Sequence, residues 1–375
     1  MSRECTVTEI NVLDNTDYRG QRGRTPTSVA APTFLEKLAH QLQTKSFKPH
    51  PRFTSGHAQT FAGYYWPRAS LKRAHRTDEA RFFDIDQGVK LLAHCRWQKD
   101  RVSCPTILLV HGLEGSNASV YMLGTAEKAY HAGFNVVRMN LRNCGNTEHL
   151  ASTLYHAGLV SDLEVVFREL CEQDGLRNIF VIGFSMGGNI SLLFAGEDAA
   201  NVPPELVGVC AVSPTIDLAS CVDAIEWREN RLYKWSFLRS MKRRIRLKRK
   251  LFPALYDTKG IRQIRRIRDF DERYTRVAGG YASADDYYAR ASSGPVISQI
   301  RTPALIVHAQ DDPFVPFHPF RDPSIAENPY VILQTPLHGG HVGFIGASEN
   351  GEDRFWMENR LVEFCKLVHE NSLSE

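Results

Sequence analysis

The sequence lacks the long apolar stretches that would anchor a protein in a membrane or direct its export. Nowhere in the 375 residues do about 18 apolar residues follow one another, which is the length that a membrane-crossing helix requires. The N-terminal segment MSRECTVTEINVLDNTDYRG has no apolar core of a secretory signal peptide. The net charge is only +4, so the total charge predicts no strong attraction to a polyanion. We therefore expect a soluble, cytoplasmic protein.

Cysteine pairs that would bind a metal or exchange disulfides are also missing. The eight cysteines are scattered, none belongs to a Cys-x-x-Cys pair, and several stand inside apolar runs, where cysteine behaves as a small hydrophobic residue. We expect reduced thiols. The sequence implies no metal and no organic cofactor.

Strand-like and helix-like segments alternate through most of the chain. Hydrophobic residues make up 43% of it, enough for a large core. Strands that alternate with helices predict right-handed crossovers and a mostly parallel sheet that is covered on both faces. The fold class is thus a doubly wound α/β fold. The expected strands are a hairpin-like pair in 81–97 and single strands in 106–112, 134–142, 178–185, 206–214, 304–312 and 330–336.

One long interval interrupts this alternation and suggests a division of the chain. Residues 216–295 lie between two expected strands and contain two helical, heavily basic stretches. An insertion after a late strand would cover the carboxyl edge of the sheet, so we expect a basic helical cap there. The α/β core is then 51–215 with 296–375, and the mixed, polar segment 1–50 is an N-terminal arm.

Ser185 is the candidate nucleophile. It stands in FVIGFSMGGNI, between a buried strand and a helix-like run, with Gly183 two residues before it and Gly187 two residues after it. This G-x-S-x-G spacing is typical of a sharp strand-to-helix turn that exposes a serine hydroxyl above the sheet. The motif alone has little specificity, so partners are required.

A serine hydroxyl needs a base, and the base needs a carboxylate that orients it. The strand at 304–312 ends in Asp311 and Asp312, and the next strand is followed by His338 and His341. We favour Asp312, which stands where the strand should end, and leave Asp311 open as the alternative. His341, beside a flexible Gly-Gly pair, is favoured over His338. The order Ser, Asp, His, with each residue after its own strand, is the order expected of an α/β-hydrolase.

The oxyanion of such a reaction needs backbone N–H donors. Met186, directly after the serine, supplies one amide, and Leu113 in the loop HGLEGS supplies the other. A phosphate-binding loop is an unfavoured alternative because the glycine-rich stretch lacks the lysine of such loops. A metal site formed by His111, His338 and His341 is equally unfavoured, since no carboxylate or cysteine spacing supports it.

With these motifs the chain resembles the α/β-hydrolase superfamily and, within it, the YheT-like hydrolases, relatives of the mammalian abhydrolase esterases and lipases. The resemblance runs from about residue 50 to the end. It implies that Ser185 is the nucleophile, Asp312 the orienting acid and His341 the base, with a carboxylic ester as substrate. The phrases that carry it are SGHAQT, HGLEGS, NLRNCG, LYHAG, GFSMGGN, FDERYTRVAGGYASADDYYARAS, DDPFVP and GGHVGF.

The function that follows is hydrolysis of carboxylic esters of short to medium acyl chains through an acyl-enzyme. Acyl transfer, thioester or amide hydrolysis on the same triad, and a catalytically silent binding protein, are the alternatives. Eight of the twelve residues 239–250 are Lys or Arg. This basic stretch is either a solvated helix face or a surface that contacts anionic membrane or an acidic head group. No nucleic-acid-binding module is recognisable, so we expect no nucleic-acid partner.

Overall fold

The computed structural model describes residues 30–68, 78–348 and 351–373. Most of the predicted arm, residues 1–29, lies outside the described residues. The seven described cysteines are all free thiols. Among the described helices, none has both the length and the apolar character to cross a membrane.

An eight-stranded sheet forms the centre of the molecule, with strand order β1-β2-β4-β3-β5-β6-β7-β8. All neighbouring pairs from β4 to β8 are parallel, whereas β1 pairs with β2 and β2 with β4 in antiparallel fashion. Every strand expected from the sequence is present, and the doubly wound fold class is confirmed. The strands are β1 Glu79–Asp86, β2 Val89–Arg96, β3 Thr106–Val110, β4 Asn135–Met139, β5 Ile179–Phe184, β6 Leu206–Val212, β7 Ala304–Val307 and β8 Val331–Gln334.

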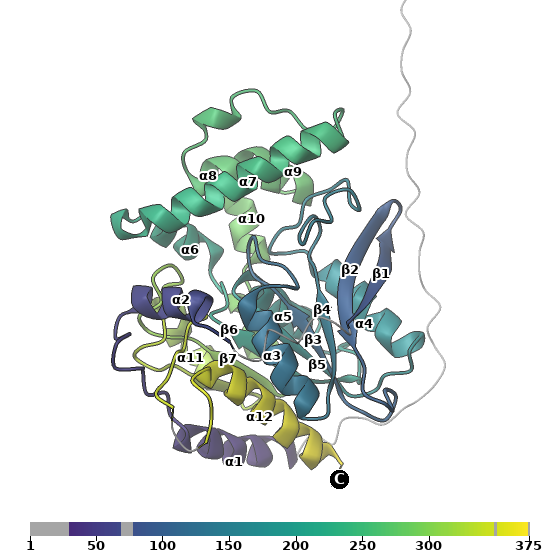
Figure 1. Ribbon diagram of the computed structural model, residues 1–375, viewed down its shortest axis with the longest axis vertical. Coiled ribbons are helices and arrows are strands. Elements are labelled where there is room, and N and C mark those ends of the chain that lie inside the picture. The colour runs from purple at the N-terminus through teal and green to yellow at the C-terminus, as the bar shows by residue number, and fades with distance from the viewer. Residues whose placement is uncertain (1–29, 69–77, 349–350, 374–375) are drawn as a thin grey trace, which may run out of the picture.

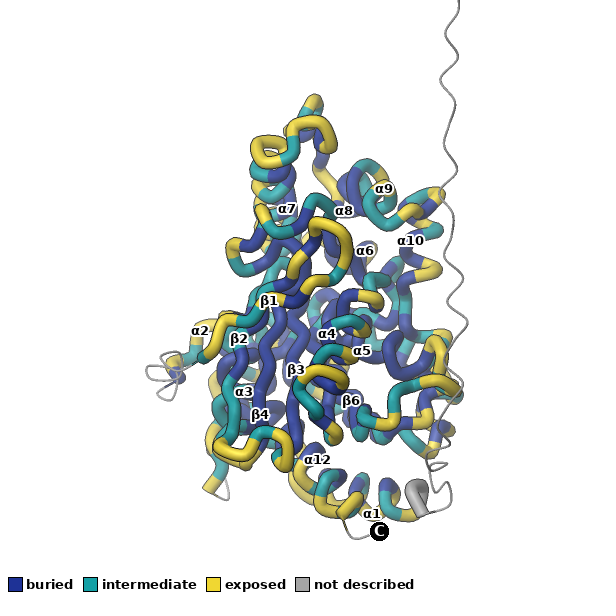
Figure 2. The backbone as a smooth tube through the Cα atoms, turned by 90° about the vertical axis from the view of Figure 1, so that its right-hand side faces the viewer, coloured by how far each residue is buried: buried dark blue, intermediate teal, exposed yellow. Residues whose placement is uncertain are grey.

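Helices cover both faces of the sheet (Figures 1 and 2). Along β5 the side chains alternate between two cores: Ile179 and Val181 pack on the side of α4 and α5, and Phe180 and Ile182 pack on the side of α1, α3 and α12. Because both faces are buried, β5 is apolar throughout instead of alternating with polar residues. The covering helices are α1 Ala30–Thr44, α2 Gly56–Tyr65, α3 Val120–His131, α4 Val160–Glu172, α5 Met186–Gly196, α11 Pro323–Ala326 and α12 Trp356–Ser372.

A group of helices between β6 and β7 lies above the sheet, at the top of Figure 1. It follows the carboxyl end of β6 along the chain. The longest member is α7, whose buried side contributes Leu238, Met241 and Ile245 to the core. The elements are α6 Leu218–Ile225, α7 Arg231–Leu251, α8 Ile267–Phe270, the π-helix η4 Asp271–Thr275, α9 Arg276–Gly279 and α10 Ala284–Ala291; short 3-10 turns occur at Arg228–Asn230, Ile261–Gln263, Gly294–Gln299 and His318–Arg321.

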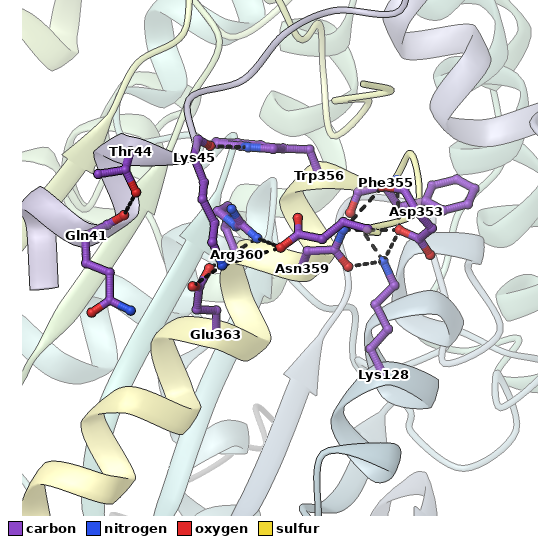
Figure 3. A network of polar contacts seen from close by, with 11 residues as sticks. Gln41, Thr44, Lys45, Lys128, Asp353, Phe355, Trp356, Asn359, Arg360 and Glu363 are labelled. Carbon is purple, nitrogen blue, oxygen red and sulfur yellow. Dashed lines mark hydrogen bonds and ion pairs between the residues drawn. The ribbon is translucent and has the colours of Figure 1, made fainter. Parts of the chain in front are cut away.

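At the other end of the molecule, ion pairs tie the end of α1 to α12 (Figure 3). Glu363 of α12 accepts from Lys45 at 2.5 Å and pairs with Arg360 at 3.1 Å. Trp356 Nε1 donates to the Lys45 carbonyl at 2.7 Å. From α3, Lys128 donates to Asn359 at 2.6 Å. We define this set as the α1–α12 network; it joins the end of α1, α3 and α12 to one another.

Candidate active site

Ser185 lies on the turn between β5 and α5 with φ 55° and ψ −120°. A positive φ is uncommon for any residue other than glycine, so the surrounding structure must hold it. A Cβ on Gly183 would lie 2.1 Å from the Gly187 carbonyl oxygen, and a Cβ on Gly187 would lie 2.4 Å from the Val110 oxygen. The two glycines therefore permit the close approach of α5 to β5 and β3 that forms the turn.

Asp312 and His341 are hydrogen bonded, with 2.8 Å between Asp312 Oδ2 and His341 Nδ1. The other carboxylate oxygen accepts from the amides of Phe314 and Val315 at 3.1 and 3.0 Å. Burial by itself would raise the pKa of Asp312, but the electrostatic interaction with His341 and the hydrogen bond from it outweigh burial and hold that pKa below its usual range. An ionised carboxylate can only accept hydrogen bonds, so Nδ1 of His341 carries the proton. In the neutral ring Nε2 is then the nitrogen that can accept a proton.

The alternative residues from the sequence form a second Asp-His pair. Asp311 Oδ2 lies 3.2 Å from His338 Nδ1, and Asp311 Oδ1 accepts from the Gly340 amide at 2.9 Å. This pair is open to solvent: the His338 side chain is 44% exposed, against 11% for His341. The Asp312–His341 pair is therefore the better sheltered from water of the two pairs.

The loop that carries His341 is held by α2. Thr60 Oγ1 accepts from the His341 amide at 2.9 Å, and the Gln59 side chain bonds the backbone of Ile345 through both its oxygen and its nitrogen. A Cβ on Gly340 would lie 2.2 Å from the Gly56 carbonyl oxygen, so helix and loop pack backbone to backbone. The sequence analysis assigned no role to the GHAQT phrase and therefore missed Thr60. The available signal was a glycine in each of the two segments, Gly56 in this phrase and Gly340 beside His341.

Ser185 and His341 are connected through Phe314. The Phe314 ring lies 4.0 Å from the His341 ring, centroid to centroid, and Phe314 lines a cavity together with Ser185. Ser213 at the end of β6 accepts from the Val342 amide at 3.2 Å. The Ser185 hydroxyl itself makes no hydrogen bond within the described part of the chain. Hydrogen bonds between a nucleophile and its base are often long or poorly aligned without substrate. The missing bond therefore does not exclude proton transfer from Ser185 to His341.

Two backbone amides beside Ser185 have no hydrogen-bond acceptor among the described residues. Leu113 and Met186 both line the Ser185 cavity, and neither amide donates a hydrogen bond to another described residue. Met186 opens α5, and the first N–H groups of a helix have no intrahelical acceptor. Free donors facing the same cavity as a serine can stabilise an oxyanion.

His111 fixes the peptide that carries the Leu113 amide. Burial lowers the pKa of His111 to about 4, so the ring is neutral. Its Nε2 lies 3.1 Å from the Leu141 amide and accepts from it, which leaves the proton on Nδ1. Nδ1 then donates to the Gly112 carbonyl at 2.7 Å. Because the peptide is planar and trans, a fixed Gly112 carbonyl also fixes the direction of the Leu113 N–H.

The cavity at Ser185 measures about 80 Å³ and is predominantly apolar. One water requires roughly 10–15 Å³ by the same kind of measure, so the space corresponds to several water molecules. Its walls come from the helices above the sheet and from the loop after β7. They include Leu218, Val222, Ile225, Phe237, Ile267 and Val315.

One carboxylate also faces this cavity. Asp271 of the π-helix η4 accepts from Thr275 at 2.6 Å and from Tyr288 at 2.8 Å. Burial raises the pKa of Asp271 to about 6, against the lowering effect of these hydrogen bonds. The Tyr288 neighbour Tyr287 accepts from the Ala157 amide at 3.0 Å. Both tyrosines pack in the core, and the pair belongs to the wall of the cavity.

Known proteins share this arrangement of elements. A family model described as the alpha/beta hydrolase fold matches residues 105–347. The Escherichia coli (strain K12) protein YheT, which carries an esterase name, is 32% identical over 323 residues, or 85% of this chain and 92% of that protein. Human phospholipase ABHD3 is 28% identical over 247 residues, 66% of this chain and 60% of that protein. The Pyrococcus furiosus esterase Pf2001 aligns with a TM-score of 0.52 at 18% identity, covering 80% of this chain and 95% of that one; at this identity it shows the fold alone.

Proposed function

Because the chain belongs to the α/β-hydrolase family, we propose that it is a carboxylic ester hydrolase that forms an acyl-enzyme on Ser185. The observation that carries the proposal is the cavity that joins Ser185 to two unpartnered amides and, through Phe314, to the buried Asp312–His341 pair. The relatives named as an esterase and a phospholipase support the same reaction class.

In the proposed reaction His341 removes the proton of Ser185 as the hydroxyl oxygen attacks the ester carbonyl. The carbonyl oxygen becomes an oxyanion, which the Leu113 and Met186 amides stabilise. His341 then gives the proton to the leaving alcohol, and a Ser185 ester remains. Water, activated by the same imidazole, releases the acid and restores the serine. Asp312 keeps His341 in the correct tautomer and stabilises its charged form.

Labelling by a fluorophosphonate probe tests the nucleophile. We expect Ser185→Ala to abolish labelling and to lower kcat by at least about 10³-fold, because removal of a triad member leaves only oxyanion stabilisation and binding. Ser298→Ala is the matched control, since Ser298 is an exposed serine outside the cavity. Equal labelling of Ser185→Ala and the wild type would overturn the assignment.

We propose that the natural acyl chains are short to medium. The small, apolar cavity beside Ser185 supports this, and residues 216–295, which supply much of its wall, act as a cap in the same proposal. A series of p-nitrophenyl esters of increasing acyl length gives the test: kcat/KM should rise to a maximum at short or medium length and then fall. A continuous rise through the longest chains would contradict it.

Contact with anionic membrane through the cap belongs to the proposal as well. Arg239, Arg243 and Arg246 lie on the exposed side of α7, and none of the three forms an ion pair with a described residue. Exposed Trp235 stands on the same helix. Each basic residue near an anionic surface contributes about 1 kcal/mol. Binding to phosphatidylserine vesicles should weaken as salt is added; binding that is absent, or independent of salt, would contradict the contact.

A further inference from the structure

The cap helix α7 holds the residue that follows Leu113. Glu114 accepts from Arg244 through both carboxylate oxygens, with 3.2 Å from Nε to Oε1 and 3.0 Å from Nη2 to Oε2. Ser240, one turn earlier on α7, also donates to Oε2. The Arg244 and Glu114 side chains are only 11% and 9% exposed. This two-point ion pair therefore joins the cap to the loop after β3 in a site that water barely reaches.

Tyr155 also binds Glu114. Its hydroxyl accepts from the Glu114 amide at 3.0 Å and donates to Glu114 Oε1 at 2.9 Å, so it holds backbone and side chain together. The Arg244 guanidinium lies over the Tyr155 ring at 5.2 Å, and its Nη1 donates to the Asn143 carbonyl in the loop after β4. We call Glu114, Tyr155, Ser240 and Arg244 the cap clamp.

The clamp acts on a backbone that would not hold its shape alone. Glu114 has φ 58°, a left-handed conformation that glutamate rarely adopts. On one side of Leu113, the Gly112 carbonyl is held by His111 and by the Gly115 amide at 3.0 Å. On the other side, the Leu113–Glu114 peptide is held by the clamp alone, because Tyr155 is the only described partner of the Glu114 amide.

We propose that Arg244 and Ser240 of α7 are positioning residues for the oxyanion donor: by holding Glu114 they keep the Leu113 amide aimed at the substrate carbonyl oxygen. The Leu113 N–H is then held from two sides: His111 fixes its direction through the Gly112 carbonyl, and the clamp fixes the position of the peptide that follows Leu113. The proposal rests on the acyl-enzyme reaction described above. A donor that is fixed before the reaction stabilises the developing charge without reorganisation, and this advantage is lost when the loop can relax.

Arg244→Met tests the clamp, with Arg231→Met as the matched control. Both residues belong to α7, but Arg231 is exposed and makes no ion pair with a described residue. With a water-soluble p-nitrophenyl ester, we expect Arg244→Met to lower kcat about 10- to 100-fold, somewhat less than loss of a whole oxyanion donor, and to change KM by less than about threefold. The second-order rate of fluorophosphonate labelling should fall in parallel. Arg231→Met should behave as the wild type.

Two further variants keep the test decisive if Arg244→Met folds poorly. Ser240→Ala removes one donor to Glu114 and leaves the ion pair, so kcat should fall by about two- to fivefold at normal stability. In a cycle of Glu114→Gln, Arg244→Met and the double variant, the effects on kcat should be strongly non-additive, because both residues act through one contact. Arg244→Lys should recover part of the lost kcat.

Three results would overturn the proposal. These are a kcat of Arg244→Met equal to that of Arg231→Met, a loss confined to KM, or a loss of kcat that only matches the loss of folded protein. If any of them occurs while Ser185→Ala abolishes labelling, the clamp inference fails and the proposed function stands. Absence of labelling in the wild type would instead remove the proposed function.

Discussion

The cap clamp and the α1–α12 network use the same chemistry at opposite ends of the molecule (Figures 1 and 3). In each, an arginine on one helix pairs with a glutamate: Arg244 with Glu114 at 3.0 Å, and Arg360 with Glu363 at 3.1 Å. They differ in what is attached to the glutamate. Glu363 belongs to the regular helix α12, whereas Glu114 belongs to a loop with a left-handed backbone next to a catalytic candidate.

The comparison indicates that the role of an ion pair depends on the kind of backbone segment that it holds in place. A regular helix already has its hydrogen bonds, so a pair on it adds to stability and to the docking of a neighbouring helix. A loop whose amide must stay free for a ligand has no such internal support, and a side-chain contact has to supply it. Loss of the first pair should be seen in unfolding experiments, and loss of the second in turnover.

The largest effect is expected at the catalytic end, for Asp312→Asn. Asparagine leaves His341 without a carboxylate and can bind it in the wrong tautomer, so kcat should fall about 10⁴-fold. Asp311→Asn is the control of identical chemistry one residue away and should retain most activity, since Asp311 pairs with exposed His338. Steady-state rates on a soluble ester give the measurement. If the two variants were equally impaired, the choice of Asp312 would be wrong.

An intermediate effect is expected for the pH dependence of stability, through the buried carboxylate of the cap. Burial raises the folded pKa of Asp271 to about 6 from 3.8, so the folded state binds its proton more tightly than the unfolded state. Its contribution to stability is then present below about pH 4, is lost as the pH rises to about 6, and stays lost above that. At about 1.4 kcal/mol per pKa unit, the loss is roughly 2 to 3 kcal/mol.

Asp271→Asn should remove this loss. Urea unfolding of both proteins at pH 4 and at pH 7.5 gives the measurement: the unfolding free energy of the variant, relative to the wild type, should increase by roughly 2 to 3 kcal/mol between the two values. A difference that stays constant across this range would show that the carboxylate is not perturbed in the folded protein.

The smallest effect is expected in the α1–α12 network. Glu363→Gln weakens the bonds to Lys45 and Arg360 while leaving the volume unchanged, so the free energy of unfolding should fall by about 1 to 2 kcal/mol. Thermal unfolding measures this, and kcat should stay within about twofold of the wild type. A large loss of kcat at unchanged stability would break the comparison, because the network would then act on the site and not on the helices.

Much of the fold could be predicted from the chain because its signals are local. A strand buried on both faces is a short apolar run, and the elbow around Ser185 shows as two glycines at fixed spacing. Ser185, Asp312 and His341 each follow a strand of their own, and this order predicted that they lie at the carboxyl edge of the sheet. Asp311 and Asp312 could not be separated fully, since each follows the same strand and each finds a histidine.

What the sequence by itself determined is therefore the alternation of strands and helices and the turn at Ser185, and it supports the proposal that Asp312 and His341 are the partners of this serine. Only the tertiary structure decided what holds them. Thr60 reaches the His341 amide across 281 positions, and Arg244 reaches Glu114 across 130. The physical reason is that strands, helices and sharp turns follow from neighbouring residues, whereas a buried hydrogen bond or ion pair depends on two distant segments arriving at one place, which no local pattern records.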